Sequence, residues 1–99
     1  MNSVKIGPMV YTVSVVERLE GDDGHKIDGH IIYNTLSVAL DAALAPQMAR
    51  QVLWHEILHG ILNQSGLPDI GDKEEAIIDV LAYGIIGALD DNPELRGPA

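Results

Sequence analysis

Three short segments in the first half of the chain carry the alternating apolar and polar positions that are typical of β-strands. They cover residues 10–19, 29–33 and 36–41. A Gly-Asp-Asp-Gly run at residues 21–24 separates the first two segments, and an Asn-Thr pair separates the second from the third. In the third segment, apolar residues alternate with small or polar ones, as expected of a strand with one buried face.

The second half of the chain carries a helical pattern twice. The first helix is predicted over residues 46–64, with a proline at its first position, where a missing N–H costs nothing. Gly66 is the expected residue just past its end, and Pro68 prevents continuation. A second helix is predicted over residues 72–91, and Pro93 ends it.

Strands followed by helices indicate an α+β fold, a small antiparallel sheet of about three strands packed on two helices. The 99 residues correspond to one domain over residues 1–99, with a small core. The longest apolar stretch is interrupted by Asp79 and is too short to span a bilayer. No signal peptide is recognisable at the N-terminus, so a cytoplasmic location is expected.

Charge and cysteine content exclude several functions. The net charge is −9 with only six Lys and Arg residues, which argues against nucleic acid and anionic membranes as partners. The chain has no cysteine, so disulfides, thiol catalysis and zinc–thiolate sites are excluded. Any bound metal must therefore use His, Asp or Glu as ligands.

The first predicted helix contains a His-Glu-x-x-His motif formed by His55, Glu56 and His59. Positions i and i+4 of a helix lie on one face, so both imidazoles can bind one zinc ion. Glu56 lies about 100° around the helix, beside such an ion, where it can accept a proton from metal-activated water. The motif by itself also arises by chance, so it indicates rather than proves a zinc site.

A catalytic zinc usually has three protein ligands, so a third must come from elsewhere. The residue types and positions leave several candidates open, namely His25, His30, Asp69, Asp72, Glu74, Glu75 and Asp79. Asp79 lies alone in an apolar helical run, and Glu75 shares its face. A buried lone carboxylate needs a partner, and a zinc-bound imidazole offers its second N–H. We therefore predict Glu75 as third ligand and Asp79 as the residue that orients one histidine, whereas Glu74 is interpreted as a helix N-terminal charge.

These two motifs resemble the gluzincin pattern of thermolysin-like zinc peptidases. There, one helix provides His-Glu-x-x-His and a second provides Glu-x-x-x-Asp, matched here by residues 55–59 and 75–79. The chain also resembles short phage-associated metallopeptidases of the ImmA/IrrE group over residues 10–95, including its Leu-Trp-His-Glu run and the Asn-Pro at residues 92–93. The resemblance implies a zinc-dependent peptidase with one Zn²⁺ per chain and Glu56 as general base.

The resemblance also implies how substrate binds. In such peptidases, an edge strand before the metal helix holds an extended peptide, and Leu36 to Asp41 is the candidate here. A residue that stabilises the oxyanion is also expected. Tyr83, eight positions beyond Glu75, is one candidate. Tyr33 and His30 are others.

Two further expectations remain. The alternative function is a zinc-containing regulatory or interaction module that docks a protein partner without efficient proteolysis. A fourth ligand from His30 or His25 would favour that module. The second helix is apolar all round, so its small-residue face is expected to be covered by residues 6–9 or by a second copy of the chain, a homodimer.

Overall fold

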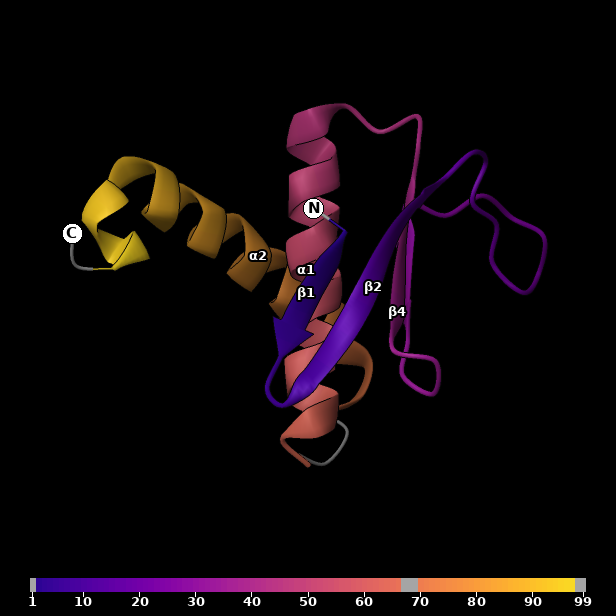
Figure 1. Cartoon of the computed structure of the whole chain (residues 1–99), viewed down its shortest axis with the longest axis horizontal. Coiled ribbons are helices and arrows are strands. Elements are labelled where there is room, and N and C mark those ends of the chain that lie inside the picture. Colours follow the sequence, from indigo (N-terminus) through magenta and orange to yellow (C-terminus); the bar gives the residue numbers. More distant parts are fainter. Residues whose placement is uncertain (1, 67–69, 98–99) are drawn as a thin grey trace.

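The computed structural model describes residues 2–66 and 70–97 and shows an α+β fold, with a four-stranded mixed sheet against a helical layer (Figure 1). The strands are β1 (Ser3–Ile6), β2 (Met9–Val16), β3 (Gly29–Ile32) and β4 (Ser37–Asp41). The helices are α1 (Pro46–Gln64) and α2 (Glu74–Asp91), and 3₁₀ turns lie at η1 (Gly71–Lys73) and η2 (Pro93–Arg96).

The sheet differs from the expected antiparallel three-stranded one in two ways. A short additional strand, β1, forms a hairpin with β2 through a turn in which Gly7 has φ +57°. The strand order is β1-β2-β4-β3, and β2 and β4 pair in parallel, with Val13 opposite Val38. This strand order arises because the long connection after β2 takes the chain one strand position away from β2 before β3 begins. β4 then occupies the position between β2 and β3. Local alternation reports strands but not this order.

The expectation that Leu36 to Asp41 forms an edge strand is wrong. β4 lies between β2 and β3, so the outer strands of the described sheet are β1 and β3. Four consecutive β4 residues are buried, including Asp41, whose carboxylate accepts hydrogen bonds from the backbone N–H groups of Leu19 and Ala43. These hydrogen bonds lower the pKa of Asp41, because they stabilise its charged form. The charged carboxylate therefore occupies an interior position, which the alternating sequence pattern had assigned to the solvent-facing side of the strand.

The core lies between the sheet and α1. Its fully buried side chains come from the sheet, and partly buried side chains of α1 pack against them. The sheet contributes Ile6, Tyr11, Val38 and Leu40, and α1 contributes Val52, Leu53 and Ile57. At Gly60 the helix lies close to the sheet, since a Cβ built there would lie 2.8 Å from Ile6 Cδ1 and 3.1 Å from Ile31 Cδ1. The glycine therefore sets how deeply α1 sits on the sheet.

Replacing Gly60 with valine should lower the free energy of unfolding by about 1–3 kcal/mol, because the branched side chain must push the helix away from Ile6 and Ile31. Chemical denaturation followed by circular dichroism measures this change. Gly84→Val is the matched control, because among the described residues no atom of another element lies within 4 Å of the Cβ position there. Equal stability losses in the two variants would contradict a close helix–sheet contact at Gly60.

Helix boundaries agree closely with the sequence prediction, with one exception. α1 covers residues 46–64, and Gly66 follows its end at φ +73°, as predicted. Pro68 and Asp69 lie outside the described residues. α2 begins later than predicted: Asp72 lies in the 3₁₀ turn η1 and caps nothing, since no side chain caps α2.

α2 packs on α1, and within the described part of the chain its backbone does not approach the sheet closely (Figure 1). Its buried residues are Ile78 and Ala82, both on the aliphatic face predicted to enter the core. The expectation that residues 6–9 cover its small-residue face is wrong, because these residues form the β1–β2 hairpin, which packs against α1. Among the described residues, a Cβ at Gly84 or Gly87 would meet no atom of another element within 4 Å, so these two positions are uncovered.

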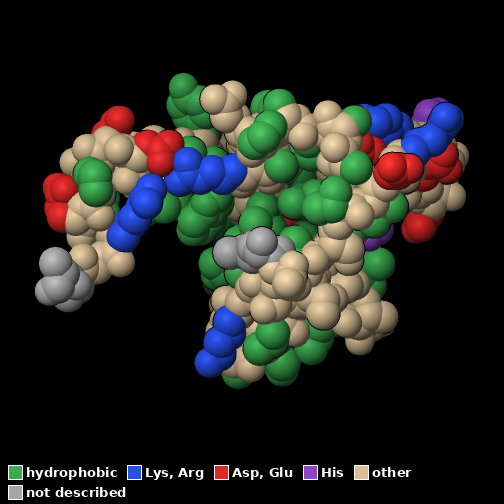
Figure 2. Space-filling model, turned by 45° about the horizontal axis from the view of Figure 1, so that its top comes forward, with side chains coloured by type: hydrophobic (Ala, Val, Ile, Leu, Met, Phe, Trp, Pro, Cys, Tyr) green, Lys and Arg blue, Asp and Glu red, His purple; other side chains and the backbone are tan. Residues whose placement is uncertain are grey.

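Acidic side chains concentrate at the two ends of the molecule. Figure 2 shows them over the C-terminal part of α2 and over the turns that follow β2. Neither α1 nor α2, the two long helices of the described chain, combines the length and apolar composition of a membrane span.

Candidate metal centre

The His-Glu-x-x-His motif lies in the middle of α1, on its side that faces α2. His55 and His59, one turn apart, have their Nε2 atoms 3.2 Å from each other. Ligand atoms of His55, Glu56 and His59 all lie within 4.8 Å of one another, which is close enough to hold one metal ion. The imidazoles are largely shielded, with 17% and 12% of their side chains exposed. The pairing therefore matches the sequence prediction.

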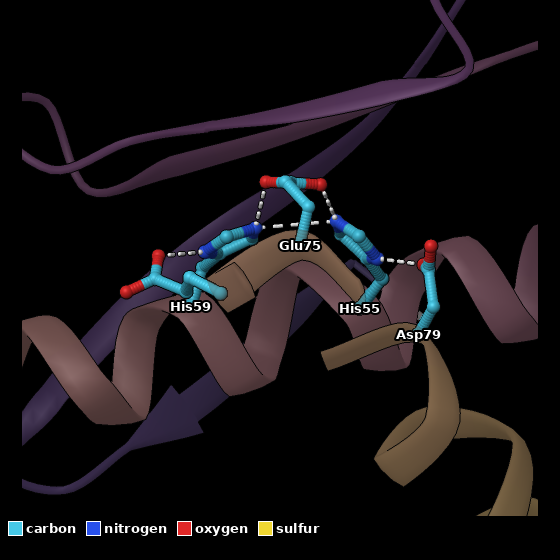
Figure 3. Close-up of polar contacts among 5 residues, drawn as sticks. His55, His59, Glu75 and Asp79 are labelled. Atoms are coloured by element: carbon cyan, nitrogen blue, oxygen red, sulfur yellow. Dashed lines mark hydrogen bonds and ion pairs between the residues drawn. The ribbon is translucent and has the colours of Figure 1, made fainter. Parts of the chain in front are cut away.

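Glu75 lies across the two imidazoles, at the start of α2 (Figure 3). Its Oε2 is 3.0 Å from His55 Nε2 and its Oε1 is 2.7 Å from His59 Nε2. The carboxylate thus bridges the two nitrogen atoms that a shared metal ion would use. Glu75 therefore lies within reach of a metal between the two rings, and its role as third ligand stays a prediction.

The other nitrogen of each imidazole contacts a separate carboxylate. His55 Nδ1 lies 2.7 Å from Asp79 Oδ1 (Figure 3), and His59 Nδ1 lies 3.0 Å from Glu74 Oε2. The expectation that Asp79 is buried is wrong, because 64% of its side chain is exposed. Because a carboxylate accepts hydrogen bonds, both contacts favour the tautomer with the proton on Nδ1. Nε2 of each ring lies against the Glu75 carboxylate, so in the metal-free chain these contacts need a proton on Nε2, and a metal ion would take the place of that proton.

The contact of Glu74 with His59 was not predicted. The sequence analysis gave this residue only a role in the helix dipole, because it lies about 100° from Glu75 on the helix surface. A signal was nevertheless present: two ligating histidines need two Nδ1 partners, and Asp79 can serve only one of them. The first turn of α2 crosses α1 closely enough for both adjacent glutamates to reach the same histidine.

Glu56 is the buried acid of the site, with only 7% of its surface exposed. Burial raises the pKa of its carboxyl, because removal from water disfavours the charged form. The nearby His55 and His59 oppose this increase, and Glu75 adds to it. A carboxyl with this environment is suited to exchange a proton with a bound reactant.

A cleft of about 300 Å³ opens beside the two histidines. One wall is β3, the outer strand, and the other comes from the helices. The lining residues are Gly29, His30, Ile31, Tyr33, His55, Glu56, His59 and Glu75. Burial raises the pKa of Tyr33, and Glu56 raises it further, so its hydroxyl keeps its proton and can donate a hydrogen bond into the cleft. The edge of β3 therefore lies next to the candidate metal site.

The remaining candidates lie elsewhere. Tyr83 is 73% exposed and lines a separate cleft between α1 and α2, because eight residues of helix carry it about 12 Å along the axis from Glu75. His25 is exposed in its turn and pairs with Asp23, as expected of a loop residue. Asp72 is exposed in η1. None of these three lines the cleft beside the histidines.

Comparison of the chain with protein-family models, with curated proteins and with solved structures found no match. The geometry of the site therefore carries the functional argument alone. That geometry provides two oriented imidazoles, a bridging carboxylate, a buried acid and a cleft bounded by a strand edge.

Proposed function

We propose that this protein is a zinc-dependent peptidase in which His55, His59 and Glu75 hold the metal. The observation that carries the proposal is the bridging position of Glu75, within 3.0 Å of both Nε2 atoms. A carboxylate placed there without a metal would be an ordinary ion-pair partner of charged histidines. The Nδ1 contacts to Asp79 and Glu74 support the proposal, because they hold both rings with Nε2 toward Glu75, where a metal ion would replace the Nε2 protons.

Zinc fits this donor set. Two imidazole nitrogens and one carboxylate form the His₂Glu ligand group of catalytic zinc sites, which leaves a position for water or substrate. Magnesium and calcium favour oxygen ligands and fit less well. The cluster also has the paired-motif pattern that resembles gluzincins, with the histidines on one helix and Glu75 on the next.

The proposed chemistry divides between metal and protein. A zinc ion bound there would polarise the scissile carbonyl and lower the pKa of water. Glu56 accepts the proton of the attacking water and then passes it to the leaving amine. Asp79 and Glu74 hold the two imidazoles in position throughout. Tyr33 and His30, which line the cleft, are the residues that can reach the developing oxyanion.

The substrate proposed is an extended peptide or an unfolded protein segment. β3 is an outer strand, and four positions from Gly29 to Tyr33 line the cleft. A peptide that adds to this edge would carry its carbonyl groups past the histidines. β3 therefore replaces β4 as the proposed substrate-binding edge.

The purified protein should hydrolyse peptides from a fluorogenic library of extended sequences. Activity should disappear with a zinc chelator and return with Zn²⁺ but not with Mg²⁺. His59→Ala is the inactive comparison, because it removes one ligand. Zinc binding without hydrolysis of any library peptide would contradict the peptidase proposal and favour the regulatory or interaction module.

A further inference from the structure

Two carboxylates lie at opposite ends of the histidine pair. The Nε2 atoms of His55 and His59 face each other, so the partners of the Nδ1 atoms lie on the outer sides of the two rings. Asp79 Oδ1 contacts the ring of His55, and Glu74 Oε2 contacts the ring of His59. Within the described residues, the second oxygen of each carboxylate has no hydrogen-bond or ion-pair partner. With 64% of the Asp79 side chain and 29% of the Glu74 side chain exposed, both oxygens can bind a ligand group.

Basic side chains of this protein do not compensate these two acids. Across residues 2–66 and 70–97, no Lys or Arg lines the cleft beside the histidines. Lys73 directly precedes Glu74 in the chain, but it lines a separate apolar pocket on α2. Lys5 lies in β1, the strand at the opposite edge of the sheet from β3. The other four basic residues pair with acids elsewhere, namely Arg18, Lys26, Arg50 and Arg96.

The cleft stays negative even with a divalent metal in place. Four carboxyl groups belong to it or contact its histidines, namely those of Glu56, Glu74, Glu75 and Asp79. Two positive charges from a metal offset only part of this charge, whether or not Glu56 carries a proton. A ligand that adds positive charge beside the histidines is therefore favoured.

The open edge of β3 offers hydrogen bonds to a peptide backbone. The Asp41 N–H donates to the Asp28 carbonyl over 2.9 Å, so these residues form a hydrogen-bonded pair of the β3–β4 ladder. Such pairs alternate along antiparallel strands, so His30 also directs its backbone groups toward β4. Gly29 and Ile31 therefore direct theirs toward the open edge, and both line the cleft. These backbone hydrogen bonds hold any extended sequence, so selection requires side-chain contacts.

A peptide on β3 passes both ends of the histidine pair. A Cβ at Gly29 would lie 2.6 Å from Val52 of α1, and a Cβ at Gly60 of α1 would lie 3.1 Å from Ile31. β3 thus runs beside the segment of α1 from residue 52 to residue 60, which contains His55 and His59. A peptide along the edge of β3 meets first one and then the other of the two outer carboxylates.

We propose that the site selects extended peptides that carry a basic side chain on each side of the bond that is cleaved. Asp79 binds one of these side chains through Oδ2, and Glu74 binds the other through Oε1. The two residues therefore hold the histidines with one oxygen and select the substrate with the other. This selection rests on the proposed function, because it takes a peptide on β3 as the ligand.

Peptide binding followed by fluorescence anisotropy tests the selection without requiring hydrolysis. The protein is the zinc-loaded Glu56→Gln variant, and the probe is a labelled peptide of alanine, serine and threonine with one lysine moved along it position by position. Norleucine at the same position is the uncharged comparison. Lysine should strengthen binding about two- to five-fold at two separate positions, as expected of exposed ion pairs. Raising the salt concentration from about 0.1 M to about 1 M should remove this difference.

Asp79→Asn and Glu74→Gln assign the two positions. Each variant keeps an oxygen for its imidazole and loses the negative charge, so each should abolish the lysine preference at one of the two positions. Glu94→Gln, in η2, is the matched control and should keep both preferences. A purely structural role would weaken lysine and norleucine peptides equally. That result would overturn the proposal, and so would equal affinity for the two peptides at every position of the wild-type site.

Hydrolysis by the wild type separates this proposal from the proposed function. Cleavage of library peptides without any lysine preference would overturn the selection and leave the peptidase function. A lysine preference without cleavage would overturn the peptidase function and support the selection. A protein that binds none of the peptides would overturn docking on β3, and the selection with it.

Discussion

Glu56→Gln is expected to abolish peptide hydrolysis while leaving the bound zinc in place. Glutamine has the size and much of the hydrogen-bonding capacity of glutamate but cannot accept the proton of the attacking water. Removing a general base typically costs about two to four orders of magnitude in rate. The readouts are kcat/KM on the best library peptide and zinc content per chain by atomic absorption. Zinc content should match wild type, since Glu56 is not among the proposed ligands.

Glu94→Gln is the matched control for this change. Glu94 lies exposed in η2, at the far end of α2 from the histidines, so the same chemical substitution should leave the rate unchanged. Equal activity in wild type and Glu56→Gln would falsify the role of Glu56. If the variant lost zinc together with activity, Glu56 would instead be a metal ligand. Its carboxylate is close enough for that role, because the ligand atoms of His55, Glu56 and His59 lie within 4.8 Å of one another.

Glu75→Ala is expected to weaken zinc binding by more than about 100-fold, the largest loss among the three α2 carboxylates that contact the histidines. It removes a ligand, whereas Asp79→Ala and Glu74→Ala remove only a hydrogen bond to an imidazole. Substitutions of such supporting residues typically cost about 10- to 100-fold in affinity. Competition with a chromophoric chelator measures all three values on the same scale.

The two supporting residues also provide controls for each other. Among the described residues, Asp79 contacts His55 and Glu74 contacts His59, so the two single variants should lose affinity to a similar extent. The double variant need not equal their sum, because Glu75 joins both histidines in one network. Glu94→Ala should bind zinc like wild type, which checks for a general effect of removing negative charge. If Glu74→Ala abolished binding while Glu75→Ala preserved it, the ligand assignment would have to be reversed.

The sequence predicted those local features well that depend on a single residue or on the 3.6-residue repeat of a helix. The α1 boundaries follow from Pro46 and Gly66, which act within a single turn of chain. The His55–His59 pairing follows from helix geometry alone, because residues four apart always share a face. The α+β class followed from the order of strands and helices.

The sequence did not predict the features that depend on which segments meet. The 12-residue span between β2 and β3 carries no signal that β4 will enter between them and pair in parallel with β2. Tyr83 was a candidate because it lies eight positions beyond Glu75, but those eight residues carry it about 12 Å along the helix axis, into another cleft. Glu74 was passed over, because its contact depends on how closely α2 crosses α1.

For this protein, the sequence by itself determined the two helices and the face of α1 on which a metal could bind. Those features depend on local dihedral preferences and on the helical period, which the chain carries at every position. Only the tertiary structure decided that Glu75 bridges the two imidazoles and that β3 rather than β4 borders the cleft. Each of these depends on long-range packing, in which Gly60, Ile78 and Ala82 set the distances between elements that no local pattern encodes.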